Sequence, residues 1–183
     1  MRILLFLLDT VFFLLTAAAL LRGWMNTRRL RMTQQPGLFA MAITDWIVQP
    51  VRRVLPRAWV QANVDWGSFV AAVILSLLYA LIWHLLLQSV AGWGGGGAWA
   101  VGVPVLALTF LVRAVLQGWM LLILAYAIFS WVQPMSLVHA SLDQLVSPLL
   151  RPVRRLIPPI GGVDLSVFIV LVVLQICLML LTP

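Results

Sequence analysis

The chain has 183 residues, of which 63% are hydrophobic and only 9% are charged, and its formal net charge at pH 7 is +7. A water-soluble domain of this length needs a larger polar surface, so the composition excludes a soluble fold and indicates an all-α protein in lipid. All twelve cations are arginines and all five anions are aspartates. The single cysteine, Cys177, rules out an internal disulfide or a C-x-x-C motif.

Four apolar stretches are long enough to cross a bilayer, which takes about 20 residues of helix. The predicted spans of this integral membrane protein are residues 3–21, 66–91, 111–131 and 165–181. Residues 98–110, which include Pro104, are too short to cross alone and predict an interfacial or re-entrant segment.

The first span also resembles a cleaved signal peptide, because Arg2 precedes an apolar stretch that ends in small residues. Asp9 interrupts that stretch, and a cluster of arginines follows it at positions 22, 28, 29 and 31. Because such a cluster resists translocation, we predict that the span is retained.

The links between the spans are strongly basic. Residues 22–65 contain seven arginines and residues 132–164 contain three, whereas residues 92–110 contain none. The positive-inside rule therefore predicts two cytoplasmic links and two periplasmic termini. Arginines that flank apolar spans favour an anionic membrane surface over nucleic acid as the partner of this charge.

The two links, and the spans that follow them, resemble each other. The matching segments are DWIVQP (45–50) and DQLVSP (143–148), PVRRVLP (50–56) and PVRRLIP (152–158), and VDWGSF (64–69) and VDLSVF (163–168). Two crossings in each copy predict parallel repeats at residues 1–91 and 111–183. An outer Gly-rich loop with the interfacial segment, residues 92–110, separates them.

The second copy carries the sequence SPLLRPVRRLIPPIGGVDLS at residues 147–166. This stretch resembles the signature of the YggT family of small bacterial inner-membrane proteins, which is related to the plastid CCB3 group, and the likeness covers nearly the whole chain. The first copy departs from it because it lacks the pair Gly161-Gly162. The resemblance implies a multi-pass protein of the bacterial inner membrane without established catalytic activity. It also implies links to osmotic-shock tolerance, potassium uptake and envelope organisation in bacteria, and to haem attachment during cytochrome b6 assembly in plastids.

Each basic link is predicted to form a short helix in the membrane interface, with its apolar side toward the lipid. Pro50 and Pro148 suit the first position of such a helix, and Ser147 suits the N-cap of the second one. Asp65 and Asp164 directly precede spans and are predicted to be helix caps. The alternative is that each of these aspartates pairs with an arginine of a link.

The Pro-Val-Arg-Arg motifs are the strongest candidate for a binding site, because positive-inside anchoring alone needs neither the prolines nor the fixed spacing. We predict that the two motifs frame a basic groove for an acidic segment of a membrane protein partner or for an anionic phospholipid headgroup. Anchoring to lipid phosphates is the alternative. The predicted set is Pro50, Arg52, Arg53, Pro56, Pro148, Arg151, Pro152, Arg154, Arg155 and Pro158.

Asp9 lies inside the first span, where a carboxylate is costly and usually has a partner. Arg113 lies near the same, outer end of the third span, so we predict an intramembrane pair of Asp9 and Arg113. The alternative is that the two residues are solvated separately and that Asp9 is protonated. The only histidines, His84 and His139, lie too far apart to ligate one haem, and we predict no metal and no cofactor.

No nucleophile, acid/base pair or phosphate loop occurs at a usable spacing, so we predict that the protein is not an enzyme. The sequence favours a non-catalytic inner-membrane scaffold, assembly or envelope-stress protein, with anionic phospholipid and a membrane protein as partners. One alternative is a subunit of a potassium-related ion-transport or osmotic-stress system, and another is an accessory factor for cytochrome and haem maturation. Homo-oligomerisation stays open.

Overall fold

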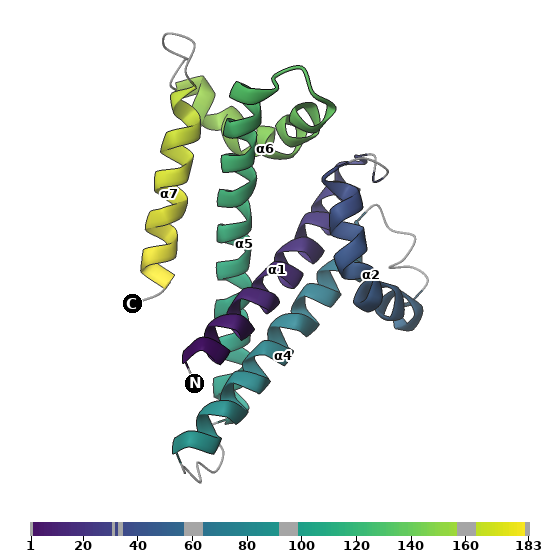
Figure 1. Cartoon of the computed structure of the whole chain (residues 1–183), viewed down its shortest axis with the longest axis vertical. Coiled ribbons are helices and arrows are strands. Elements are labelled where there is room, and N and C mark those ends of the chain that lie inside the picture. Colours follow the sequence, from purple (N-terminus) through teal and green to yellow (C-terminus); the bar gives the residue numbers. More distant parts are fainter. Residues whose placement is uncertain are drawn as a thin grey trace.

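The computed structural model describes residues 2–30, 32, 35–56, 64–91, 99–156 and 164–181. Helices joined by short turns and loops make up this part of the chain, with α2, α6 and α7 around the long helices α1, α4 and α5 (Figure 1). The helices are α1 (Arg2–Thr27), α2 (Gly37–Val54), α4 (Trp66–Ala91), α5 (Trp99–Val132), α6 (Leu137–Leu156) and α7 (Leu165–Leu181).

Three helices, α1, α4 and α5, are long and apolar enough to cross a membrane. α7 is also apolar, but its 17 residues extend about 26 Å, slightly less than the roughly 30 Å of a bilayer core. The predicted all-helical, membrane-type class is therefore confirmed. A fourth span at α7 stays a prediction.

The start of α5 corrects one prediction. Residues 99–110 are not a separate interfacial or re-entrant segment of the predicted loop 92–110, because they form the first part of a continuous helix of 34 residues. Pro104 is only the sixth residue of this helix, so its ring removes one hydrogen bond near the helix end. Phe110, which follows it, is buried and stacks on Tyr79 of α4. Packing on α4 thus extends the helix; residues 92–98 lie outside the described residues.

Both link helices are longer than predicted. Pro50 lies inside α2 and Pro148 lies inside α6, so neither proline begins a helix and Ser147 is not an N-cap. A proline in a helix interior costs about 3 kcal/mol. Leu145 and Leu150, on either side of Pro148, are fully buried. Since each buried leucine contributes about 1.5–3 kcal/mol, packing on both sides of the proline offsets the loss.

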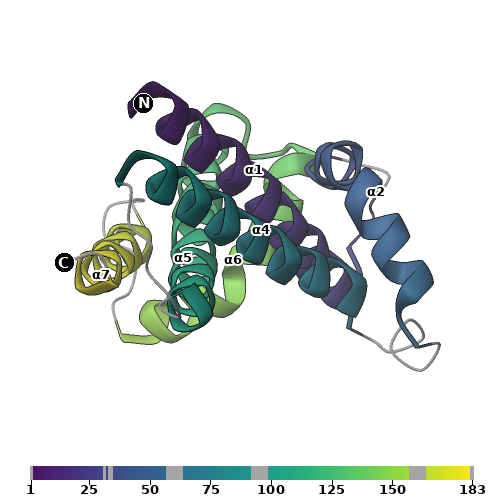
Figure 2. The same cartoon turned by 90° about the horizontal axis from the view of Figure 1, so that it is seen from below.

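Two hydrophobic clusters form part of the core of the described residues. In the first, Ile47 and Val48 of α2 pack against Ala71 and Leu75 of α4. The second joins α5, α6 and α7 through Ile123, Tyr126, Leu142, Val146, Leu150, Val170 and Leu174. Helices α1, α2 and α4 therefore form one packed group and α5, α6 and α7 form another. Figure 2 shows α1 beside α4, with α2 on one flank of the molecule and α7 on the opposite flank.

α4 and α5 join the two groups. The rings of Tyr79 and Phe110 stack with their centroids 4.0 Å apart. Further along the contact, Gly102 lets α5 approach His84 closely, because a Cβ atom at this position would lie 2.9 Å from His84 Nε2. A larger residue at Gly102 would force the His84 ring to move.

Candidate functional site

Each basic link is tied to the start of the following apolar helix by an arginine–aspartate pair. In the first link, Arg52 Nη2 lies 2.5 Å from Asp65 Oδ2, and the Asp65 side chain is only 4% exposed. Asp65 Oδ1 accepts a hydrogen bond from the backbone N–H of Ser68 at 3.2 Å, and Oδ2 accepts one from the Ser68 hydroxyl at 2.8 Å. The carboxylate therefore caps α4 and binds the arginine at the same time.

The second link has the same arrangement. Arg154 Nη2 lies 2.6 Å from Asp164 Oδ2 and also donates to Tyr126 Oη at 2.9 Å, while Asp143 lies 3.9 Å away. Asp164 Oδ1 accepts from the backbone N–H of Ser166 at 3.1 Å and from the hydroxyl of the same residue. The cap and the ion pair are thus not alternatives, because each aspartate forms both.

The charges of the second pair are stabilised by their surroundings. Burial acts to raise the pKa of the Asp164 carboxyl, but hydrogen bonds from Ser166 and Arg154, together with the Arg154 charge, hold that pKa below its ordinary value. Burial acts to lower the pKa of Arg154, but its contacts with Asp164 and Tyr126 outweigh burial and raise it. Both groups are therefore charged at neutral pH.

A glycine makes room for the first pair. A Cβ atom at Gly67, in the first turn of α4, would lie 2.5 Å from Arg52 Cγ. The Arg52 side chain therefore lies across the start of α4, and a larger residue at Gly67 would displace it from Asp65.

The two arginines of each Pro-Val-Arg-Arg motif have different surroundings. Arg52 and Arg154 are half-buried, whereas Arg53 and Arg155 are exposed. Among the residues that the structure describes, no ion pair or hydrogen bond engages the side chains of Arg53 and Arg155. Arg151 is also exposed and donates Nε to Ser147 Oγ at 2.9 Å. Of the predicted prolines, Pro50, Pro56 and Pro152 are exposed, Pro148 is half-buried, and Pro158 lies outside the described residues.

The structure does not bring the two motifs together. Figures 1 and 2 show the C-terminal ends of α2 and α6 on opposite flanks of the molecule. Each motif is held beside the aspartate of its own link, because Arg52 pairs with Asp65 and Arg154 pairs with Asp164. Within the described residues of one monomer, the predicted shared groove therefore does not form, and each motif presents its own basic surface.

A third ion pair was missed by sequence reasoning. The Arg22 side chain, near the end of α1, is only 6% exposed, and its Nη1 donates to Asp45 Oδ1 at 2.6 Å and to Thr44 Oγ1 at 3.1 Å. In the sequence Arg22 is one of several arginines that follow the first span. Nothing local separates it from the others, because its partners come from α2, which folds back onto α1.

Three helices bring polar side chains together inside the candidate spans. Arg113 Nη1 and Nη2 lie 3.4 Å from Asp9 Oδ1 and Oδ2, so the structure brings these two residues together. Tyr79 of α4 donates its hydroxyl to Asp9 Oδ1 at 3.0 Å. The sequence did not indicate Tyr79, since an isolated tyrosine in an apolar run carries no signal of its partner.

A cavity of about 480 Å³ adjoins this pair between α1, α5 and α7. Its polar lining consists of Asp9, Thr10, Arg113, Gln117 and Gln175, and the rest of its wall is apolar. Polar side chains are costly inside a membrane and usually mark a site or a pathway. Their gathering from three helices into one cavity makes it a second candidate site.

Neither candidate site has the composition of a metal centre. In the part of the chain that the structure describes, no three His, Cys, Asp or Glu side chains lie close enough to bind one ion. His84 packs against Gly102, whereas His139 stacks on Tyr126 with ring centroids 5.1 Å apart.

These observations define the class of protein. It is a helical, membrane-type protein in which all five aspartates, Asp9, Asp45, Asp65, Asp143 and Asp164, lie within 4.0 Å of an arginine. The chain belongs to the CCB3/YggT family, whose model matches residues 1–86 and 105–183.

Relatives from several bacteria match nearly the whole chain. The "Uncharacterized protein YggT" of Escherichia coli (strain K12) is 35% identical over 177 residues, which cover 96% of this chain and 87% of the relative. The "Uncharacterized protein in proC 3'region" of Vibrio alginolyticus is 32% identical over 173 residues, with 93% and 88% covered. No solved structure matches the chain.

Proposed function

We propose that the protein is a non-catalytic membrane scaffold whose basic links dock acidic groups, either the phosphates of anionic phospholipids or the carboxylates of a membrane protein partner. The different surroundings of the two arginines in each motif carry this proposal. The first arginine, Arg52 or Arg154, is held by a helix-capping aspartate, and the second, Arg53 or Arg155, is exposed. In each motif the first arginine is therefore fixed by an aspartate, and the second arginine is accessible to an external anion.

The proposal includes four membrane spans in two parallel repeats, with cytoplasmic links and periplasmic termini in a bacterial inner membrane. Each helix group supports this arrangement, because it contains two apolar helices and an amphipathic link helix that contacts both. Each group also carries the arginine–aspartate cap at the same place in its motif. The family model matches in two segments, residues 1–86 and 105–183, which lie close to the proposed repeats.

The exposed arginines suffice for measurable binding. Each arginine near an anionic membrane surface contributes about 1 kcal/mol. Because the two motifs lie apart, Arg53 and Arg155 would each contribute about 1 kcal/mol at its own surface, which corresponds to roughly a fivefold change in affinity. Because both are exposed, this binding should weaken as salt is added.

The double substitution Arg53→Gln and Arg155→Gln is therefore expected to lower the recovery of acidic partners bound at each motif roughly fivefold without unfolding the protein. The measurement is purification in a mild detergent, followed by mass spectrometry of the proteins and phospholipids that copurify. A protein that copurifies less with the variant than with wild type would be identified as the partner with acidic groups. If only anionic phospholipid is recovered less with the variant, the lipid would be identified as the partner.

The matched control is the pair Arg53→Lys and Arg155→Lys, which keeps both charges and should keep most of the binding. Arg52 and Arg154 are unsuitable for this test, because their substitution would also disturb the caps of α4 and α7. Unchanged recovery of every acidic partner in the glutamine variant would contradict the proposed function.

A second function, as a subunit of an ion-transport system, is favoured by the polar cavity between α1, α5 and α7. An ion path needs polar groups inside the membrane, and five such side chains line this cavity of about 480 Å³. Four proposed spans leave little room for a pore in one chain, so this function requires an oligomer.

On this second function, Asp9→Asn should abolish potassium flux into vesicles that contain the purified protein, because it removes the one anion that lines the cavity among the described residues. The control is Asp45→Asn, which removes an equal charge outside the cavity. Equal flux through wild type and Asp9→Asn, or no flux through wild type, would contradict transport by this route.

A further inference from the structure

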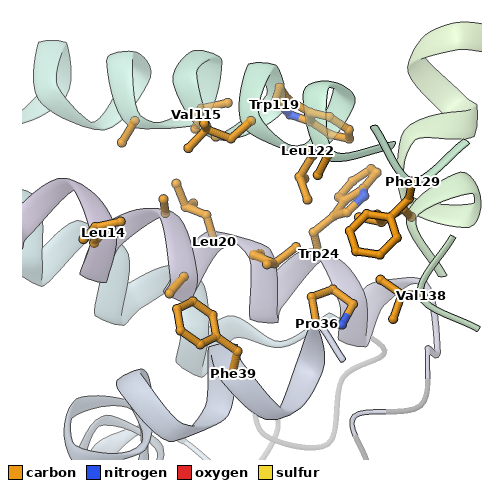
Figure 3. A pocket seen from close by; sticks show the side chains of 18 of the residues that line it. Leu14, Leu20, Trp24, Pro36, Phe39, Val115, Trp119, Leu122, Phe129 and Val138 are labelled. Atoms are coloured by element: carbon orange, nitrogen blue, oxygen red, sulfur yellow. The ribbon is translucent and has the colours of Figure 1, made fainter. Parts of the chain in front are cut away.

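A larger cavity, of about 570 Å³, lies between the two helix groups, and its wall is almost entirely apolar. Figure 3 shows Leu14 and Leu20 of α1 on one side of the cavity and Val115 and Leu122 of α5 on the other. Phe39 of α2 also lines the cavity. This volume is typical of sites for small molecules, which occupy about 300–1,000 Å³. A partner helix, about 10 Å wide, needs more room, so the cavity suits a flexible apolar chain.

The crossing of α1 and α5 gives the cavity its shape. Figure 1 shows α1 running obliquely to α5, so that the two helices diverge toward the C-terminal end of α1. Ala17 and Gly118 lie on the facing sides, where a Cβ atom on Gly118 would be 3.9 Å from the Ala17 Cβ. Toward the end of α1 the rings of Trp24 and Trp119, with centroids 5.4 Å apart, bridge the gap. Trp24 Nε1 also donates to the carbonyl of Leu145 in α6 at 3.4 Å.

Arg28 provides a positive charge next to Trp24, at this end of the cavity. The Arg28 guanidinium carbon lies 5.3 Å from the centroid of the Trp24 ring, and Trp24 lines the cavity. Arg28 is exposed, so its charge is accessible to an anion outside the apolar wall. A cation–π contact of this kind holds the guanidinium in place without neutralising it. The site therefore joins an apolar cavity to one positive charge.

We propose that an anionic phospholipid occupies this site, with one acyl chain in the cavity between α1 and α5 and its phosphate on Arg28. The charge of Arg28 matches the phosphate, and the apolar wall matches the chain. The bound lipid would contact both helix groups where they diverge and so hold them at a fixed angle. This site shares no residue with Arg53 or Arg155 and does not depend on the proposed function.

The test compares wild type with Arg28→Gln and Gly118→Leu after reconstitution with phosphatidylglycerol and return to detergent. Native mass spectrometry then counts the phospholipid molecules that each protein retains. Wild type should retain one phosphatidylglycerol molecule in this cavity, in addition to any molecule bound at the two motifs. Arg28→Gln should weaken its retention about fivefold, because it removes one contact with the phosphate. Gly118→Leu should remove this molecule, because the leucine side chain would project into the cavity beside Ala17 and obstruct the acyl chain.

Arg2→Gln is the matched control, because it removes an equal charge from an exposed residue at the opposite end of α1 and should leave retention unchanged. Arg28→Gln changes an exposed side chain, so its result stands even if Gly118→Leu does not fold. Equal retention by wild type and Arg28→Gln would overturn the proposal. Equal retention of zwitterionic phosphatidylcholine by wild type would overturn the requirement for an anionic lipid.

Discussion

Substitution of Arg113 by leucine is expected to lower the free energy of unfolding by about 3 kcal/mol, because it leaves the Asp9 carboxylate inside a candidate span without its cation. Tyr79 would still donate one hydrogen bond to Asp9, but a neutral hydroxyl does not balance the charge. The measurement is unfolding of the purified protein in mixed micelles, followed by circular dichroism, together with the yield of folded protein from membranes.

The control for this prediction is a double-mutant cycle. Asp9→Asn combined with Arg113→Leu removes both charges and should restore most of the lost stability. Arg113→Lys keeps a cation and should lose less than Arg113→Leu. If Arg113→Leu alone were as stable as wild type, Asp9 would not depend on this arginine, and a protonated Asp9 would be the better description.

Asp65→Ala is expected to lower the free energy of unfolding by about 2 kcal/mol, since one carboxylate caps α4 and pairs with Arg52. Loss of a cap costs about 1 kcal/mol, and a buried ion pair that loses one member adds to that cost. The equivalent Asp164→Ala should cost about 1 kcal/mol, because the Asp164 side chain is 28% exposed and that of Asp65 is 4% exposed. Denaturant unfolding of both variants, followed by circular dichroism, measures the difference.

Asparagine separates the two roles of these aspartates. Asp65→Asn keeps an oxygen that accepts from the backbone N–H of Ser68, but it removes the charge that holds Arg52. The free energy of unfolding of Asp65→Asn should therefore lie between those of wild type and Asp65→Ala. Equal stability of Asp65→Asn and Asp65→Ala would show that the ion pair alone matters, and no loss in either variant would contradict both roles.

Features that depend on neighbouring residues could be predicted from the sequence. The predicted spans at residues 3–21, 66–91 and 165–181 lie within α1, α4 and α7, because hydropathy acts along a continuous stretch. Asp65 and Asp164 lie at the starts of their helices, because a cap is defined by the few residues that follow it.

Features that depend on packing could not be predicted in this way. Pro50 and Pro148 suggested helix starts, but each lies inside a helix, and residues 99–110 continue α5 instead of forming a separate segment. Arg22 was predicted only as one of the arginines that follow the first span, but Asp45 of α2 binds it away from solvent. In each case a contact with another helix outweighs the local preference of the residue.

From the sequence we could predict a helical protein of the membrane type, the positions of its apolar helices, the residues of the two basic motifs and the family that the chain resembles. Composition, hydropathy and motif spacing are properties of the unfolded chain, so no fold is needed to recognise them. The tertiary structure alone decided that Arg52 and Arg154 are held while Arg53 and Arg155 are exposed, and that the two motifs lie apart. The same packing gathered polar side chains of α1, α5 and α7 around one cavity and left an apolar cavity beside Trp24. The physical reason is that an ion pair or a cavity wall needs groups from different helices, and only folding brings them within contact distance.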